Sequence, residues 1–242
     1  MNRFESRDAG ARAVALINGI EFPFRHCPPG TFAMGSPETE PGRSDDETPR
    51  WTTLTNGFWL LETQTTQRTW RALIGTNPSE LVGDDFPVSN VSERDCEEYL
   101  ALLNASGELP RGWRADLPTE AQWEYACRAG TTSAFYTGET LTPKDGNIGG
   151  AIGRPIRVGA YPPNPWGLFD MCGNVWERTK DRYAERSRED AIDPLETEGE
   201  LQVLRGGSWR SAPERNRSAF RHKDPPEHRH GYVGFRIALV RR

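Results

Sequence analysis

Glycine and proline occur so often in this chain that long, regular helices have little room to form. The 242 residues include 24 glycines and 19 prolines, and the stretch from Gly130 to the end is rich in turns. This composition predicts a loop-rich fold rather than a helical bundle. Only 35% of the residues are apolar, but eight Trp and ten Phe can close a core because each ring buries a large area. We find no repeat or linker, so we expect one domain over residues 1–242.

Two short signals predict strands near the start of the chain. Residues 13–26 place apolar side chains around Asn18-Gly19, the dipeptide most typical of a two-residue hairpin turn. Residues 58–61 (Phe-Trp-Leu-Leu) are an apolar run that predicts a short buried strand. Between these elements, residues 36–50 form a polar, acidic loop.

Capping residues mark two main helices. One is expected to begin at Ser92, whose hydroxyl can accept a hydrogen bond from a free backbone N–H group. The other is expected to begin at Thr119, because Gln122 follows three residues later and completes a capping box. Gly130 is expected to end this second helix in the left-handed conformation.

Charge is distributed unevenly along the chain. The net charge of −5 gives no general affinity for nucleic acid or for an anionic membrane, so neither is an expected partner. Residues 205–242, however, contain nine Arg and one Lys against three acidic residues. Two interpretations remain open: these arginines tie loops together through salt bridges, or they form a basic face for an acidic partner.

The cysteines are dispersed, which favours reduced thiols. Cys27, Cys96, Cys127 and Cys172 contain no Cys-x-x-Cys pair. This pattern suits buried thiols better than a disulfide framework or a zinc site. Since the first residues are too polar for a secretion signal and no apolar run could span a membrane, a cytoplasmic location is predicted.

Eight short stretches carry a resemblance to a known family. They are residues 29–36, 77–79, 87–92, 117–126, 162–168, 173–177, 205–209 (Arg-Gly-Gly-Ser-Trp) and 234–236 (Gly-Phe-Arg). In order and spacing they resemble the formylglycine-generating enzyme (sulfatase-modifying factor) family. The resemblance implies an α+β fold, an irregular variant of the C-type lectin fold with two main helices, short strands and many loops.

Active members of that family oxidise a substrate cysteine to formylglycine, using two copper-binding cysteines after the Gly-Gly-Ser-Trp stretch. In this chain Ser211 and Asn216 stand at about those two positions, and no cysteine follows Cys172. A thiolate is the soft ligand that selects copper(I), whereas serine and asparagine offer hard oxygen atoms without redox chemistry. The resemblance therefore implies the family scaffold without its catalytic residues, and no copper is expected.

The histidines raise a second metal question. Iron sulfoxide synthases of the same superfamily use histidines from an additional N-terminal helical domain, but only His26 precedes His222 here. His228 and His230 alternate, so both rings would lie on one face of a strand. Glu227 is the only carboxylate that we identify beside them, so solvated or contact-forming histidines are expected rather than a metal cluster.

Calcium is the ion that the resemblance favours, in a structural role. Family members bind it with a carboxylate or amide, two backbone carbonyls and the glutamate of the Gly-Asn-Val-Trp-Glu stretch. The matching positions here are Asp170, the carbonyls of Gly173 and Val175, and Glu177. Hard oxygen donors on a tight turn suit Ca²⁺. The open alternative is that the two carboxylates cap loops or pair with arginines.

The last segment of the chain is the predicted ligand-binding face. The chain also resembles the variable proteins of diversity-generating retroelements, which place their diversity between the Gly-Gly-Ser-Trp and Gly-Phe-Arg stretches. Arginine and tyrosine in this segment are residue types that carry much of the binding energy in interfaces. The candidate ligand-binding residues are Arg210, Ser211, Glu214, Arg215, Asn216, His222, Lys223, Glu227, His228, Arg229, His230 and Tyr232.

The predicted function is a non-catalytic binding module whose ligand is a protein or another macromolecule, with an acidic ligand favoured by the basic segment. Residues 210–232 form its binding face, and diversification of this segment by a retroelement is an open extension. Two alternatives also remain open: an oxidoreductase with an unrecognised metal site, or an accessory domain that partners a kinase or a sulfatase.

Overall fold

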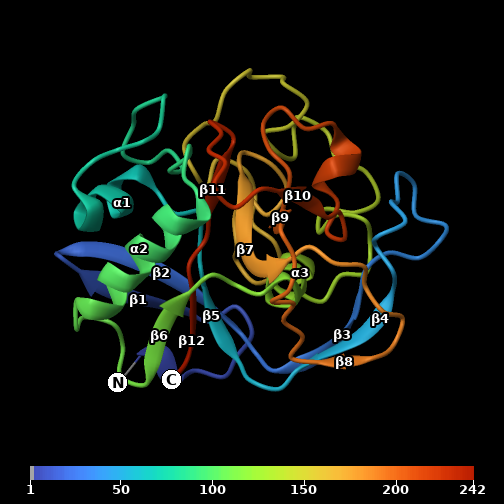
Figure 1. The fold of residues 1–242 in the computed structure, drawn as a ribbon, viewed down its shortest axis with the longest axis horizontal. Helices are drawn as coiled ribbons and strands as arrows, with labels where there is room; N and C mark the ends of the chain where they lie inside the picture. Colours follow the sequence, from blue (N-terminus) through green and yellow to red (C-terminus); the bar gives the residue numbers. More distant parts are fainter. Residues whose placement is uncertain (1–2) are drawn as a thin grey trace.

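A computed structural model describes residues 3–242, in which short strands form three small sheets around three α-helices. The largest sheet has five antiparallel strands in the order β1-β2-β5-β12-β6 (Figure 1). These strands are β1 (Arg12–Ile17), β2 (Ile20–Cys27), β5 (Phe58–Leu61), β12 (Ala238–Arg241) and β6 (Trp113–Asp116). The arrangement confirms the predicted α+β class.

The predicted hairpin is present as β1 and β2. Its turn residues, Asn18 and Gly19, both have positive φ (48° and 74°), which matches a two-residue turn that suits the twist of the strands. Ile17 pairs with Ile20 across the turn. The hairpin forms one edge of the five-stranded sheet, and β5 continues the sheet beside β2.

The two predicted main helices are confirmed, and a shorter one precedes them. They are α2 (Glu93–Ala105) and α3 (Glu120–Arg128), each with a complete capping box at its start, and the shorter helix is α1 (Gln67–Ile74). Ser92 caps α2 and Thr119 caps α3. The C-cap of α3 is Ala129 (φ 47°), one residue before the predicted Gly130, which itself has a positive φ of 90° as expected.

Strand β5 lies between two hydrophobic cores. Trp59 and Leu61 face a core that includes α1 and α2, whereas Phe58 and Leu60 face a core that includes α3. Successive side chains of a strand point to opposite faces, so a strand that is covered on both sides reads as an unbroken apolar run. This explains why the whole predicted strand is buried.

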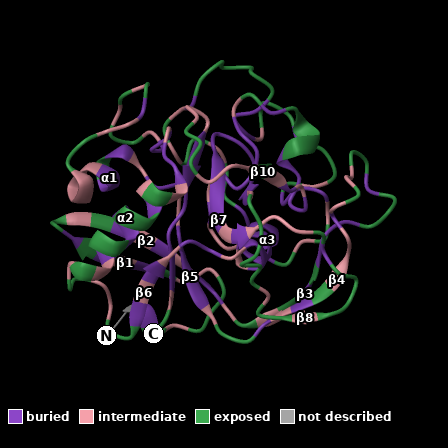
Figure 2. Ribbon diagram, in the orientation of Figure 1, coloured by how far each residue is buried: buried purple, intermediate pink, exposed green. Residues whose placement is uncertain are grey.

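A four-stranded sheet positions the C-terminal segment. Its order is β10-β9-β7-β11, from β10 (His222–Asp224), β9 (Gln202–Arg205), β7 (Trp176–Arg182) and β11 (Val233–Phe235). The third sheet, at the right in Figure 1, contains β3 (Gly30–Met34), β4 (Arg50–Leu54) and β8 (Ala191–Ile192). Figure 2 shows β7 largely buried in the middle of the molecule, with exposed loops around it.

The helices are short. Within residues 3–242, none of them is both long and apolar enough to cross a lipid bilayer.

Candidate functional site

The C-terminal segment, residues 206–232, is anchored at both ends beside β7. It leaves β9 at Arg205 and returns to the sheet at Val233 of β11. Strand β9 pairs with β7 in antiparallel and β11 pairs with β7 in parallel orientation. A buried strand therefore fixes both ends of the segment, while its middle is free to carry exposed side chains.

A glycine turn and two polar side chains form the inner corner of the segment. Gly207 has φ 76°, and a Cβ atom there would lie 1.9 Å from Asn216 Oδ1, so no other residue fits. The Asn216 amide donates to the carbonyl of Ala212 at 2.7 Å. The Ser211 hydroxyl accepts from the backbone N–H of Ser208 at 3.1 Å. These contacts hold the corner together from inside.

This corner corrects the prediction that Ser211 and Asn216 contact a ligand directly. Their exposed fractions are 7% and 0%, so neither side chain lies on the surface. The two residues that the resemblance places at about the family's copper-binding positions are hydrogen-bonded within this corner. The Ser211 hydroxyl and the Asn216 amide nitrogen are directed at neighbouring backbone groups, because a buried polar group without a partner is costly.

Internal salt bridges account for four of the nine arginines in the basic C-terminal region. Four guanidinium groups are buried against glutamates that are distant in the sequence. The pairs are Arg205–Glu124 (2.6 Å), Arg217–Glu47 (2.6 Å), Arg221–Glu120 (2.7 Å) and Arg236–Glu177 (2.8 Å). The interpretation in which arginines tie loops together thus holds for these four, while Arg210 and Arg215 stay exposed.

The pKa of Glu120 shows the effect of the buried guanidinium groups around it. Burial by itself would raise the pKa of its carboxyl group, but the guanidinium groups of Arg186, Arg221 and Arg205 outweigh burial and lower the pKa to about 2. Arg186 donates to Glu120 at 3.2 Å and Arg221 at 2.7 Å. Charges that are paired in this way fix loop positions and are not available to a partner.

Most of the remaining predicted residues do reach the surface. Three of them, Arg210, Arg215 and Lys223, are exposed cations that form no ion pair with any residue the structure describes. The predicted residues divide into an exposed group, Arg210, Glu214, Arg215, Lys223, Glu227, His228 and Arg229, and a half-buried group, His222, His230 and Tyr232.

Stacked side chains connect several of these surface residues into a row. The Arg210 guanidinium lies 4.8 Å from the centre of the Tyr232 ring, and the His230 ring stacks with Tyr232 at 4.9 Å with an interplanar angle of 8°. His228 meets His230 edge to face at 5.7 Å. We call Arg210, Tyr232, His230 and His228 the stacked row. Stacking restricts these side chains before any partner arrives.

A hollow of 460 Å³ lies beside the stacked row. Trp209, Arg210 and Tyr232 form one wall, and other walls come from distant segments. The indole N–H of Trp209 is buried and has no acceptor among the described residues. The lining residues that sequence reasoning did not identify are Glu80, Leu81, Ser89, Gly153, Arg154 and Pro155. No sequence signal links these residues to the segment, because only the fold brings them together.

Lys223 and His222 belong to another region of the surface. The Lys223 ammonium lies 4.0 Å from the centre of the Tyr183 ring, and the His222 ring stacks on Trp176 at 4.8 Å. Burial lowers the pKa of His222, which favours the neutral ring. Tyr183 follows directly after β7 and was not among the predicted residues.

The four residues predicted to bind calcium lie together, but a side chain occupies their centre. The Gln64 amide nitrogen donates to the carbonyls of Val175 at 2.9 Å and Gly173 at 3.2 Å. Its oxygen accepts from Asn174 Nδ2 at 3.0 Å. The two carbonyls that would coordinate the ion are thus directed at an amide N–H group. With Gln64 in place, these donors do not fit a calcium ion.

The two carboxylates of this set are also engaged. Glu177 accepts from the Arg236 guanidinium at 2.8 and 3.0 Å and from the Trp123 indole at 2.7 Å. Asp170 accepts from the backbone N–H of Gly159 at 2.7 Å, and burial raises the pKa of Asp170 to about 6. The arrangement weighs against calcium, whose binding here stays a prediction.

All four cysteines are free and buried. Burial raises the pKa of Cys27, Cys96 and Cys172. The Cys127 thiol lies beside Cys172 and 3.6 Å from Ser218 Oγ. Burial acts to raise the pKa of Cys127, but its contacts with Cys172 and Ser218 outweigh burial and lower it; all four thiols are nevertheless enclosed rather than exposed at the surface.

The histidine pair has a carboxylate neighbour that sequence reasoning missed. Glu227 was the only carboxylate identified there, but the residue between the two rings is Asp224, which lies 3.2 Å from His228 Nδ1 and 3.4 Å from His230 Nε2. The spacing of four residues between Asp224 and His228 was visible in the sequence. The sequence did not predict that the following loop folds back and places both histidines beside the end of β10.

Comparison with known proteins is consistent with this fold. The family model of the Sulfatase-modifying factor enzyme 1-like domain matches residues 26–241. The formylglycine-generating enzyme of Mus musculus is 33% identical over 194 residues, which cover 70% of this chain and 48% of that enzyme. Serine/threonine-protein kinase pkn1 of Chlamydia caviae is 38% identical over 128 residues, which cover 50% of this chain and 20% of the kinase. The matches thus span half or less of these relatives.

A solved structure agrees over nearly the whole chain. Treponema denticola variable protein 1 superposes with a TM-score of 0.84 at 23% sequence identity, covering 94% of this chain and 98% of that chain. At this identity the similarity establishes the fold, and it agrees with the α+β, C-type lectin-like fold predicted from the sequence. From the extent of the family match, the chain belongs to the Sulfatase-modifying factor enzyme 1-like domain family.

Proposed function

We propose that this chain is a non-catalytic binding module that contacts a protein or another macromolecular ligand through residues 210–232. The observation that carries the proposal is that some side chains of the segment are buried and hydrogen-bonded while others are exposed. Ser211 and Asn216 face inward and are hydrogen-bonded within the glycine turn, whereas Arg210 and Tyr232 stack on each other at the surface. The inner residues build a rigid support and the outer ones remain available for contact.

Rigidity matters because binding must offset the entropy lost when side chains become ordered. The stacked row is already held by ring contacts, and the carbonyl of His228 accepts from Arg178 at 2.6 Å. Arg and Tyr are among the residues that most often dominate interface energies. The unpaired indole N–H of Trp209 in the adjacent hollow would gain an acceptor from a bound ligand.

The chemistry of the segment supports binding over oxidation. Copper-dependent oxidation at the aligned positions needs two thiolates, and those positions hold Ser211 and Asn216. The thiols of this chain are instead enclosed in the cores, which suits a reducing compartment such as the cytoplasm.

The ligand is expected to be mixed in charge, with a few carboxylates, rather than a strongly acidic polymer. Arg210, Arg215 and Lys223 offer unpaired positive charge, but Glu214 and Glu227 lie exposed in the same segment. This balance refines the prediction of an acidic partner. Nucleic acid remains disfavoured because the whole chain carries a net charge of −5.

Site-specific photo-crosslinking tests the proposal. A photoreactive phenylalanine analogue is placed at Arg215 or Lys223, and control positions are the exposed Ile192 and Leu16 in other sheets. We expect specific crosslinked partners from the first pair only, and weaker crosslinking when Arg210→Ala or Tyr232→Ala is added. Identical products from both pairs, or none from Arg215 and Lys223, would contradict the proposal.

Diversification by a retroelement is an extension of this proposal. It is supported by the place of the exposed residues, between the two frames at 205–209 and 234–236, and by the fold shared with a variable protein. Sequencing the DNA beside the gene tests it. A template repeat matching codons 210–232, with a reverse transcriptase gene, is the expected finding, and their absence would remove the extension while leaving the binding surface intact.

An accessory role beside a kinase is the second candidate. It is favoured by the match to a protein kinase of Chlamydia caviae, in which a related stretch makes up only 20% of the longer chain. A kinase gene adjoining this one, together with crosslinking of that kinase at Arg215, would support the second candidate. Crosslinks to unrelated proteins would count against it.

A further inference from the structure

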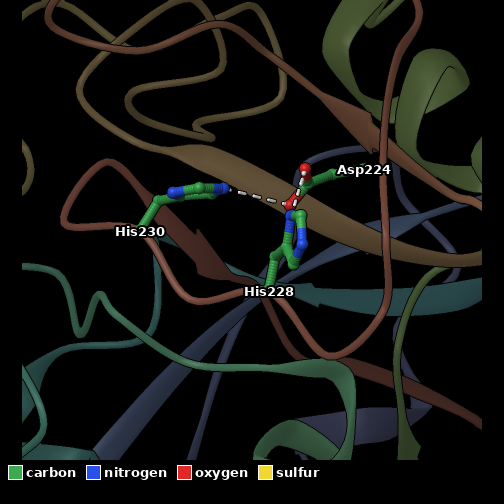
Figure 3. A group of neighbouring side chains, drawn as sticks. All are labelled: Asp224, His228 and His230. Carbon is green, nitrogen blue, oxygen red and sulfur yellow. Dashed lines mark hydrogen bonds and ion pairs between the residues drawn. The ribbon is translucent and has the colours of Figure 1, made fainter.

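Asp224, His228 and His230 form a compact cluster at the edge of the binding surface. Asp224 ends β10, and the two histidines lie in the loop that leads to β11. One ligand atom from each of the three residues lies within 4.8 Å of the other two. Figure 3 shows the two imidazole rings directed at the Asp224 carboxylate, with His228 Nδ1 at 3.2 Å and His230 Nε2 at 3.4 Å.

The donor set points to one class of ligand. Two imidazole nitrogens and one carboxylate are ligands that zinc and neighbouring divalent transition ions prefer. Calcium and magnesium, in contrast, select sites built from oxygen atoms. Metal–ligand bonds of about 2.0–2.1 Å in a tetrahedral arrangement place neighbouring ligands roughly 3.3 Å apart. The distance of 3.2 Å from His228 Nδ1 to Asp224 Oδ1, which is also a hydrogen bond, and that of 3.4 Å from His230 Nε2 to the other oxygen, Oδ2, are close to that spacing.

The surroundings of one Asp224 oxygen provide a second observation. Asp224 Oδ2 is buried and accepts no hydrogen bond from any described residue, although His230 Nε2 faces it at 3.4 Å. A buried acceptor without a donor costs free energy, and a positive ion beside it removes that cost. His228 remains about half exposed, so an ion could enter from that side and keep open positions for water or for a ligand group.

The loop that carries the histidines is held before any ion binds. The carbonyl of His228 accepts from Arg178 at 2.6 Å, and the carbonyl of His230 accepts from the backbone N–H of Asn90 at 2.9 Å. The His230 ring is also stacked on Tyr232. A site whose ligands are already oriented needs little rearrangement, which favours affinity.

We propose that Asp224, His228 and His230 bind a divalent transition-metal ion of the zinc type, with coordination positions left open toward the solvent. The site is distinct from the predicted calcium residues and uses none of the positions aligned with the family's copper-binding cysteines. Metal binding at this site does not require that the surface bind a macromolecule. The metal site and the proposed function are therefore tested independently of each other.

Titration of the untagged, metal-free full chain with zinc tests the site, and cobalt(II) absorption reports the ligand geometry. We expect one zinc ion per chain at this site, and a cobalt(II) absorption spectrum typical of a metal ion with a low coordination number. His228→Ala and His230→Phe, the latter keeping a ring to stack on Tyr232, should each weaken zinc binding at least about tenfold. Asp224→Asn should weaken it as well.

His222→Phe is the matched control. It removes a histidine of the same segment that stacks on Trp176 and lies outside the cluster, so zinc affinity should stay unchanged. Circular dichroism confirms that each variant is folded. No saturable binding of zinc or cobalt by the unsubstituted chain, or equal affinity in all four variants, would overturn the proposal.

Discussion

Arg217 and Glu47, 170 positions apart in the chain, form a buried bidentate ion pair with N···O distances of 2.6 and 2.7 Å. The same guanidinium group donates to Glu40 at 2.7 Å and to the carbonyl of Gly42 at 2.5 Å. The acidic loop at residues 36–50 is thereby fastened to the C-terminal segment. This agrees with the interpretation in which arginines of the C-terminal region tie loops together through salt bridges.

Replacing Arg217 should therefore be costly. Arg217→Met leaves two buried glutamates without their cation, and we expect the free energy of unfolding to fall by about 3–5 kcal/mol. Arg188→Met is the control, since Arg188 and Glu38 form an exposed pair at 3.8 Å and its loss should cost less than about 1 kcal/mol. Denaturant unfolding measures both, and equal effects in the two variants would refute the assigned role of Arg217.

Gln64 tests the predicted calcium site. Because its amide already donates to the carbonyls of Gly173 and Val175, calcium and chelator should both leave the melting temperature unchanged. Gln64→Met should lower the free energy of unfolding by about 2–4 kcal/mol, since it removes the donor of those carbonyls and one of the two acceptors of Asn174 Nδ2. A melting temperature that rises with calcium and falls with chelator would restore the calcium prediction.

Asp181 should make stability depend on pH. Burial and the neighbouring Glu120 carboxylate raise the pKa of Asp181 to about 7, above its ordinary value of 3.8, although hydrogen bonds from Glu120 and Glu196 and the charge of Arg221 act against this. The folded chain thus holds a proton that the unfolded chain loses near pH 4. This contribution to stability is complete below about pH 4 and is lost as the pH rises toward 7.

Asp181→Asn removes that titration. Relative to the unsubstituted chain, the variant should gain stability as the pH rises from 4 to 7, by up to about 4 kcal/mol for a shift of roughly three pKa units. Asp45→Asn, at a fully exposed side chain, should show no such trend. Urea unfolding at several pH values measures the difference in the free energy of unfolding between the variant and the unsubstituted chain. A difference that does not change between pH 4 and 7 would show that Asp181 is charged over this whole range and would contradict the prediction.

The four thiols should be unreactive in the native protein. Cys27, Cys96, Cys127 and Cys172 are at most 2% exposed, so a thiol reagent such as Ellman's reagent should find none in buffer and all four after unfolding without reductant. Prompt reaction of a native thiol would contradict the enclosed positions. Only two thiols after unfolding would instead indicate a disulfide, with Cys127 and Cys172 the pair already in contact.

Local signals predicted the local structure well. Asn18-Gly19 forms its hairpin turn, and Ser92 and Thr119 cap the two main helices, because each of these depends on residues within a few positions of one another. At the end of α3 both Ala129 and the predicted Gly130 have positive φ, and the C-cap lies one residue earlier than predicted.

Long-range partners could not be predicted from one sequence. No sequence pattern predicts that Arg217 pairs with Glu47, or that the Gln64 side chain donates to the Gly173 carbonyl. Ser211 and Asn216 were predicted to bind a ligand because they lie in the segment that the resemblance marks as the binding face, yet both are buried and hydrogen-bonded to backbone groups of the glycine turn. Asp224 was missed because its role depends on how the following loop folds back.

We propose that this chain binds a ligand through residues 210–232 and does not oxidise it. The most direct measurement is dioxygen consumption by the purified chain with a cysteine-containing peptide, after reconstitution with copper(I) and, separately, with iron(II), and with mass analysis of the peptide. We predict no consumption above the protein-free metal control and an unchanged peptide. Protein-dependent dioxygen consumption with multiple turnovers of the peptide thiol would contradict the account.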